Sequence, residues 1–133
     1  MRVRTVAAMS RQVTIRNALL GTGVMGLWHE STNTVWLDVG LTAAERRCTL
    51  AHELVHAERG DVPCGDAVLD VRQEHRVERE AARRLVSWPA LLEVSRWART
   101  PVEAAEALDV DLPTLRARIA GLTPREHEVL RRA

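Results

Sequence analysis

Residues 42–60 read TAAERRCTLAHELVHAERG, and this stretch decides how the rest of the chain is arranged. Thr42 and Glu45 form a capping box, in which the hydroxyl and the carboxylate satisfy free backbone amides at a helix start. Gly60 is a typical residue for the end of a helix. We therefore predict a helix that begins after Thr42 and runs to about Arg59.

The same helix carries an H-E-x-x-H motif, His52-Glu53-Leu54-Val55-His56. The spacing of four residues puts both imidazoles on one face, one turn apart, so both reach a single metal ion, for which zinc is the natural choice. Glu53 lies about 100° around the helix from His52, where it can act as a general base towards the attacking water. The motif predicts a zinc peptidase.

This helix is also expected to be buried on two sides. One set of apolar residues flanks the histidine face (Leu41, Cys48, Val55), and another lies opposite (Leu50, Leu54, Ala57). A chance match to the motif would more often fall on a solvated helix. A buried helix that presents His-Glu-His to one cleft is better explained as part of a metal-binding site.

A catalytic zinc site needs a third protein ligand, and the next predicted helix, residues 67–86, offers carboxylates. Glu78 has apolar neighbours within about 60° on the helical wheel, namely Val71, Ala81, Ala82 and Leu85. A buried carboxylate is costly unless it meets a cation or metal, so Glu78 is the predicted third ligand, with a buried ion pair to arginine as the alternative. Glu74 is the second choice. His75 is placed to orient a ligand or to stabilise the oxyanion.

The two cysteines receive separate interpretations. Cys48 lies one turn before His52, which is too far along the helix axis for its sulfur to bind the same tetrahedral metal ion. We interpret it as a small core residue. Cys64, in the predicted loop 61–65, is within sequence reach of Cys48. We expect free thiols in a reducing compartment, and a disulfide between them stays open as the alternative.

The flanking segments predict an α+β fold. Short β-type runs at 12–15, 24–29 and 34–38 indicate a small sheet, and the last two form a hairpin with the loop 30–33. Residues 1–89 are then a core of sheet and two antiparallel helices, and 90–133 a helical subdomain packed on it. The first predicted helix of this subdomain begins near Ala90 and carries Trp97. Further helices are predicted to begin at residues 101, 112 and 124.

Residues 101–120 also match the apolar skeleton of a helix-turn-helix, with Arg116 and Arg118 on the second helix as candidate nucleic-acid contacts. The turn carries Asp109 where glycine is usual. The alternative is that these helices pack on the core or dock a repressor.

Composition excludes several kinds of chemistry. All the basic side chains are arginine, and there is no Lys or Tyr, so a Schiff-base lysine or a catalytic tyrosine is impossible. With a net charge of +1, the protein as a whole is not attracted electrostatically to nucleic acid or acidic membranes. No apolar run is long enough to span a membrane, and we expect a cytoplasmic protein.

Together, the segment from Arg47 to His56 and Glu78-Arg79-Glu80-Ala81 resemble the ImmA/IrrE family of metallopeptidases. The likeness runs from about Gly26 to Leu122 and includes the strand Val35-Trp36-Leu37-Asp38. The resemblance implies a zincin-like core with zinc on His52, His56 and Glu78, and Glu53 as catalytic base.

The resemblance also implies the substrate, a helix-turn-helix repressor cleaved in phage or mobile-element induction or in a stress response. The alternative is a non-catalytic antirepressor or a DNA-binding regulator with the same zinc fold. Where the family commonly has Asn or Asp, this chain has Ala82, and where an aromatic residue is usual it has Arg84. A side chain that could orient a zinc-binding histidine is therefore missing at position 82.

Overall fold

A four-stranded sheet with the order β1-β2-β4-β3 forms one layer of the protein. The computed structural model describes residues 4–8, 11–61 and 65–133. Its strands are β1 (Arg4–Ala8), β2 (Arg11–Ala18), β3 (Gly26–His29) and β4 (Thr34–Asp38). β2 and β4 are parallel, and the other neighbouring pairs are antiparallel. The predicted hairpin is confirmed as β3 and β4, so β3 is an edge strand.

Helices follow the sheet in the described part of the chain: α1 (Ala43–Arg59), α2 (Ala67–Leu85), α3 (Trp88–Ser95), α4 (Pro101–Leu108), α5 (Leu112–Ala120) and α6 (Pro124–Arg132). The capping box of Thr42 and Glu45 is present, and Gly60 ends α1 in the left-handed conformation. Ser87 caps α3, which begins two residues earlier than predicted because Pro89 fits in a first helical turn. Trp97 lies just beyond α3 rather than in it.

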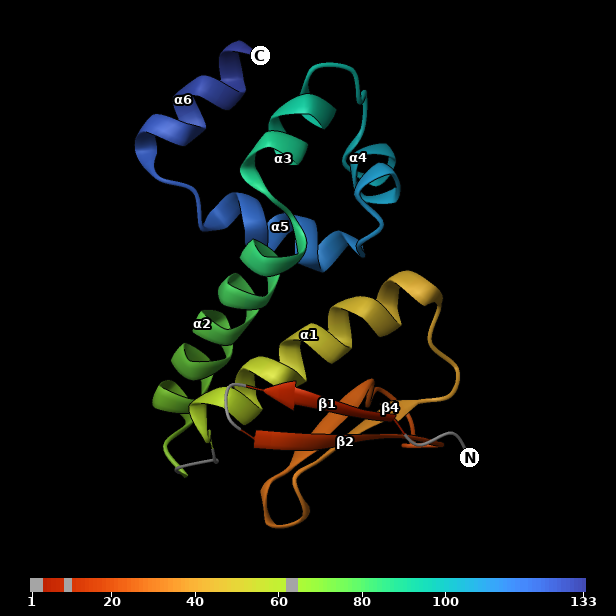
Figure 1. The fold of residues 1–133 in the computed structure, drawn as a ribbon. Coiled ribbons are helices and arrows are strands. Elements are labelled where there is room, and N and C mark those ends of the chain that lie inside the picture. Colours follow the sequence, from red (N-terminus) through yellow and green to blue (C-terminus); the bar gives the residue numbers. More distant parts are fainter. Residues whose placement is uncertain (1–3, 9–10, 62–64) are drawn as a thin grey trace.

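α1 lies on one face of the sheet (Figure 1). Alternate residues of β2 and β4 point towards it and are fully buried with Ala57 (Val13, Ile15, Val35, Leu37). On the opposite face, the guanidinium of Arg16 stacks 5.8 Å from the centroid of the Trp36 ring. This alternation has the period of two expected of a half-buried sheet.

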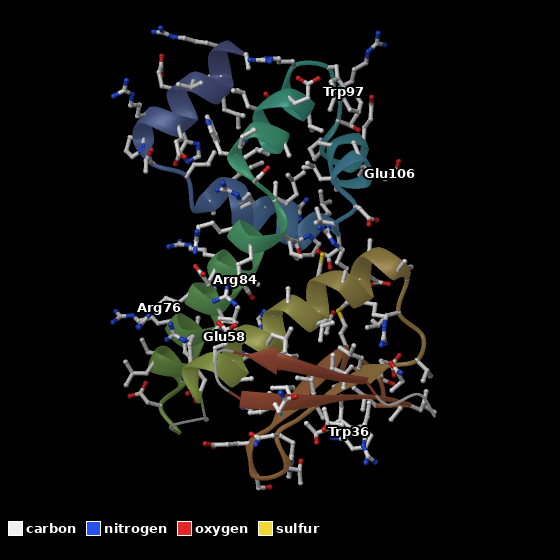
Figure 2. The ribbon with its side chains drawn as sticks, in the orientation of Figure 1. Trp36, Glu58, Arg76, Arg84, Trp97 and Glu106 are labelled. Carbon is white, nitrogen blue, oxygen red and sulfur yellow. The ribbon has the colours of Figure 1, made fainter. Side chains whose placement is uncertain are left out.

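α2 packs on another side of α1. Val55 of α1 meets Val77 and Ala81 of α2 in a small buried cluster. The ion pair between Glu58 and Arg84, with 2.5 Å between oxygen and nitrogen, also joins the two helices (Figure 2). The predicted two-sided burial of α1 is therefore confirmed.

The helices from α3 onward gather at the far end of α2, away from the sheet (Figure 1). Their core includes residues from both sides of the predicted boundary at 89, among them Cys48, Val86, Leu91 and Leu115. The guanidinium of Arg47 donates to backbone oxygens at the ends of α2 and α4. None of the described helices is long and apolar enough to cross a membrane.

Candidate metal centre

His52 and His56 lie side by side on α1, as their spacing predicts. Their ring centroids are 4.9 Å apart, with the rings at 70° to one another. The capped, buried helix holds both imidazoles in place, and His56 is only 8% exposed.

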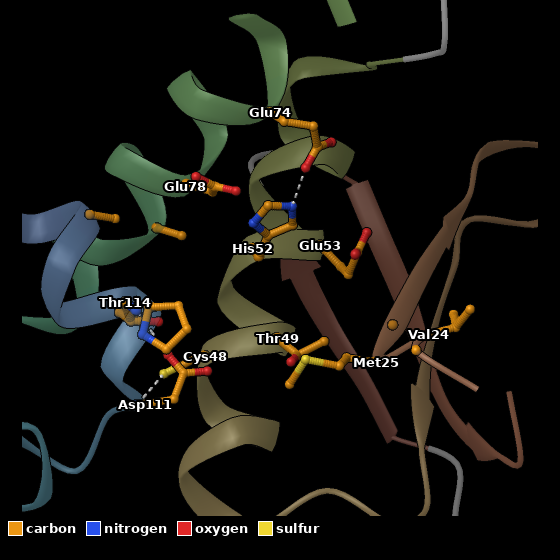
Figure 3. Close-up of a pocket in the computed structure, with 15 residues that line it drawn as sticks. Val24, Met25, Cys48, Thr49, His52, Glu53, Glu74, Glu78, Asp111 and Thr114 are labelled. Atoms are coloured by element: carbon orange, nitrogen blue, oxygen red, sulfur yellow. Dashed lines mark hydrogen bonds and ion pairs between the residues drawn. The ribbon is translucent and has the colours of Figure 1, made fainter. Parts of the chain in front are cut away.

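Glu74 of α2 completes the cluster. One carboxylate oxygen lies 3.0 Å from Nε2 of His52 (Figure 3). The other oxygen lies 2.7 Å from Nε2 of His56. The donor atoms of the three residues lie within 4.8 Å of one another. The structure therefore brings the second choice of the sequence interpretation, and not the first, to the histidines.

Glu78 is exposed and lies one turn further along α2, outside this cluster. The prediction that it lies on a buried stripe is wrong, since Val71 on the same side is 53% exposed. The helical wheel assumes that one face of α2 is covered along its whole length. In the structure, α2 packs against α1 through Val77 and Ala81. Glu78 lines the same cleft as His52 and Glu74, and its role as a zinc ligand stays a prediction.

Glu53 is buried beside the two histidines, 9% exposed, and lines the adjoining cleft. Burial raises the pKa of its carboxyl group, and the neighbouring histidines oppose that rise when they are charged. A carboxylate with little solvation that faces a cleft suits the predicted role of proton acceptor.

Asp61 holds the second nitrogen of His56. The carboxylate lies 3.2 Å from Nδ1 of His56 and also accepts a hydrogen bond from Arg59 at 2.9 Å, with its side chain only 9% exposed. The turn at Gly60 brings it there, because Asp61 donates its backbone amide to the carbonyl of His56. Carboxylates in this position fix the tautomer and orientation of metal-binding histidines.

A cleft of about 570 Å³ opens beside the cluster. Residues 23–26 form one wall, α1 lies between, and α2 with the start of α5 forms the other wall (Figure 3). At Gly26 the edge strand comes so close to α1 that an added Cβ would lie 2.5 Å from Cγ2 of Thr49 and 3.3 Å from Cγ of Glu53.

Other predicted site residues lie elsewhere. His75 is exposed and does not line the cleft, because one residue past Glu74 the helix has turned by about 100° away from α1. The predicted orienting or oxyanion role of His75 therefore has no geometric support. Cys48 is a buried free thiol in the core, as predicted, and burial raises its pKa. Cys64 lies outside the described residues.

Arg118 is buried, 8% exposed, and donates to the carbonyl of Val86 at 2.7 Å. The prediction that it contacts nucleic acid is therefore wrong, because its guanidinium joins α5 to the end of α2. Arg116 is exposed, and a nucleic-acid contact there stays a prediction. The start of α5, the end that would enter a DNA groove, packs on α1, where the amide of Asp111 lies 3.4 Å from the sulfur of Cys48.

Sequence reasoning missed Asp61, Gly26 and the α5 wall of the cleft. For Asp61 one signal was available, since a glycine at the end of a helix turns the chain back beside the last helical turn. The contacts of Gly26 and α5 depend on tertiary packing, for which a single sequence holds no local signal.

The donor set fits zinc. Two imidazole nitrogens and one carboxylate are a typical catalytic zinc set, which leaves a fourth position open. Ligand atoms around a tetrahedral zinc ion with bonds of about 2.0–2.1 Å lie roughly 3.3 Å apart. His52, His56 and Glu74 offer one such atom each, and these atoms lie within 4.8 Å of one another.

Residues 12–106 match the peptidase family M78, described as the IrrE N-terminal-like domain. Because this match covers more than half of the chain, the protein belongs to that family of peptidases. No curated protein and no solved structure matches the chain significantly. The family and the possible His-His-Glu metal site together support a function of the metallopeptidase kind.

Proposed function

We propose that the protein is a zinc-dependent endopeptidase that cleaves a helix-turn-helix transcriptional repressor. The observation that carries the proposal is the convergence of His52, His56 and Glu74 beside the buried Glu53. A zinc ion held by the first three residues would polarise the carbonyl of the scissile peptide bond.

The protein's own groups do the remaining work. Glu53 takes a proton from the attacking water and passes it to the leaving amine. Asp61 keeps the His56 ring oriented, with Nε2 turned towards Glu74. Asp61 thus gives His56 an orienting carboxylate, a role that Ala82 cannot fill.

The edge strand β3 gives the substrate a place to bind. An extended peptide can pair with the main chain of an edge strand, and β3 ends the sheet directly beside the cleft. Met25 and Leu27 are exposed there, 37% and 50%, and offer apolar contacts to substrate side chains. Pairing along β3 would lay the scissile bond across the metal centre.

The repressor as substrate is supported by the resemblance to the ImmA/IrrE family. A helix-turn-helix repressor gene, if one is found next to the gene for this protein, would nominate the substrate. Purified repressor, incubated with the zinc-loaded protein, should give two defined fragments. The Glu53→Gln variant should keep its zinc and lose cleavage by a factor of roughly 10²–10⁴.

Two results would contradict the proposal. Undiminished cleavage by Glu53→Gln would rule out the mechanism. Full release of repression by Glu53→Gln, without any cleavage, would instead identify a non-catalytic antirepressor.

A further inference from the structure

One side of α2 carries only arginines and apolar residues, and it faces away from α1. At about 100° per residue, these side chains fall within a sector of roughly 100° of the helix. All of them are exposed (Val68, Leu69, Arg72, Arg76, Arg79, Arg83). Val77 and Ala81, which pack on α1, lie on the other side of the helix, and Figure 2 shows Arg76 pointing away from α1. We call this sector the arginine face.

We propose that the arginine face is an exosite, a docking surface outside the cleft, for an acidic amphipathic helix of the protein that is cleaved. The proposal rests on the proposed peptidase function and adds a second contact between enzyme and substrate. Such a contact would let the enzyme recognise a folded protein by more than the residues around the scissile bond.

The arginine face lies next to the cleft. The same helix carries Glu74 of the metal centre and Glu78 of the cleft wall, so a protein that occupies the cleft lies beside α2. The stem of Arg79 reaches the end of α5, since a Cβ on Gly121 would lie 3.8 Å from Cγ of Arg79. The face therefore extends to the helix that forms the other wall of the cleft.

Most of the positive charge on this face is not neutralised by the protein itself. In the described part of the chain, Arg72, Arg76 and Arg79 form no ion pair, whereas Arg83 pairs with Glu80 at 2.7 Å. Successive arginines are three or four residues apart, so they are neighbours on the helix surface and repel one another. A second helix with carboxylates at the same spacing would supply the missing opposite charge.

The apolar residues at one end of the face favour a protein partner over a nucleic acid. Val68 is 62% exposed and Leu69 is 50% exposed, and both lie in the first turn of α2. Interfaces between proteins combine apolar residues with arginine, whereas a phosphate backbone gives apolar side chains nothing to pack against. We therefore expect a partner with carboxylates along its length and apolar side chains at one end.

Binding of a defined peptide tests the exosite without requiring cleavage. The probe is a fluorescent synthetic helix that carries glutamate and leucine at helical spacing, and its anisotropy is measured against the full chain. Arg72→Glu combined with Arg76→Glu should weaken binding by about tenfold, because two attractive ion pairs become repulsive. Leu69→Ser should weaken it by about threefold, because apolar contact is lost.

The matched control makes the same charge change on another helix. Arg131→Glu combined with Arg132→Glu reverses two exposed arginines of α6 and should bind the probe as the wild type does. If the doubly reversed α2 protein does not fold, Arg72→Gln with Arg76→Gln makes the same comparison. Failure of the wild type to bind the probe, or equal binding by the α2 and α6 variants, overturns the proposal.

A nucleic-acid duplex is the alternative partner, and it is tested in the same assay. The proposal is wrong if the wild type binds a random-sequence duplex in preference to the acidic helix, with binding that Arg72→Glu and Arg76→Glu abolish and Leu69→Ser leaves unchanged. Such a result would assign the arginine face to nucleic acid.

Cleavage assays separate the exosite from the proposed function. With a cleavable protein substrate, the double α2 variant should raise KM for that protein roughly tenfold more than KM for a short peptide that spans the scissile bond. Equal changes for protein and peptide would contradict only the exosite. Binding of the acidic helix by a protein that never cleaves would contradict only the proposed function.

Discussion

Gly26 marks the closest approach between the edge of the sheet and the helix that carries the histidines. A Cβ at this position would meet Thr49 and Glu53 and lie 3.2 Å from the carbonyl oxygen of Trp36. Gly26→Ala should therefore cost roughly 1–3 kcal/mol of unfolding free energy, because the backbone of β4 cannot yield easily. It should also displace Glu53 and lower peptidase activity. Denaturant unfolding and a peptide cleavage assay measure the two effects.

Gly121→Ala is the control for this substitution. The Cβ of Gly121 would have only ordinary contacts, at 3.5 Å or more, and the residue has helical backbone angles. If both variants unfold at the same denaturant concentration, the close packing of β3 on α1 is not what restricts position 26.

Asp61 makes a prediction about metal affinity. Asp61→Ala removes the acceptor from Nδ1 of His56, so zinc should bind more weakly by a factor on the order of 10–100. Asp61→Asn keeps a hydrogen-bond acceptor for His56 and should lose less zinc affinity. Arg59→Ala removes only the ion pair to Asp61 and should bind zinc almost as the wild type does. Competition with a chelator gives the three affinities, and equal values for Asp61→Ala and wild type would contradict the role of Asp61.

Individual residues differ in how far the sequence could place them. His52, Glu53 and His56 follow from a motif whose geometry is local to one helix. The third ligand depends on which face of α2 meets α1, and that face changes along the helix, because only part of α2 is covered. Glu74 and Glu78 differ by one turn, and the helical wheel placed Glu78 on a buried face although the residue is exposed.

Among the elements, α4 and α5 form a helix-turn-helix in outline, with Asp109 in the left-handed conformation that glycine usually adopts. α5 nevertheless uses its N-terminus and Arg118 to pack on the peptidase core. The sequence pattern indicated the helices and their caps, while their burial against α1 and α2 depends on contacts far apart in the chain. β1 was also missed, since its residues form a strand through pairing with β2.

Arg118 and Arg116 should differ in their effect on stability. Arg118→Ala leaves the carbonyl of Val86 without its donor and should cost roughly 2–3 kcal/mol. Arg116→Ala, at an exposed position on the same helix, should change stability by less than about 0.5 kcal/mol. Thermal or denaturant unfolding separates the two. Equal stability of both variants would show that the buried guanidinium does not hold α5 to α2.

At the scale of the whole molecule, the division at residue 89 does not separate two cores. The cluster that contains Leu91 and Leu115 also contains Cys48 of α1 and Val86 at the end of α2. The protein should therefore unfold in one cooperative transition, with equal calorimetric and van't Hoff enthalpies. A chain that ends at residue 89 should lose that transition, because part of its core would be exposed. Two resolved transitions in the full chain would contradict this prediction.

The most direct test of the central claim is the zinc content of three proteins after dialysis against a competing chelator: the wild type, Glu74→Gln and Glu78→Gln. If His52, His56 and Glu74 hold the metal, the wild type and Glu78→Gln should each keep one zinc ion per chain, and Glu74→Gln should lose it. Loss of zinc from Glu78→Gln, with zinc retained by Glu74→Gln, would contradict the account.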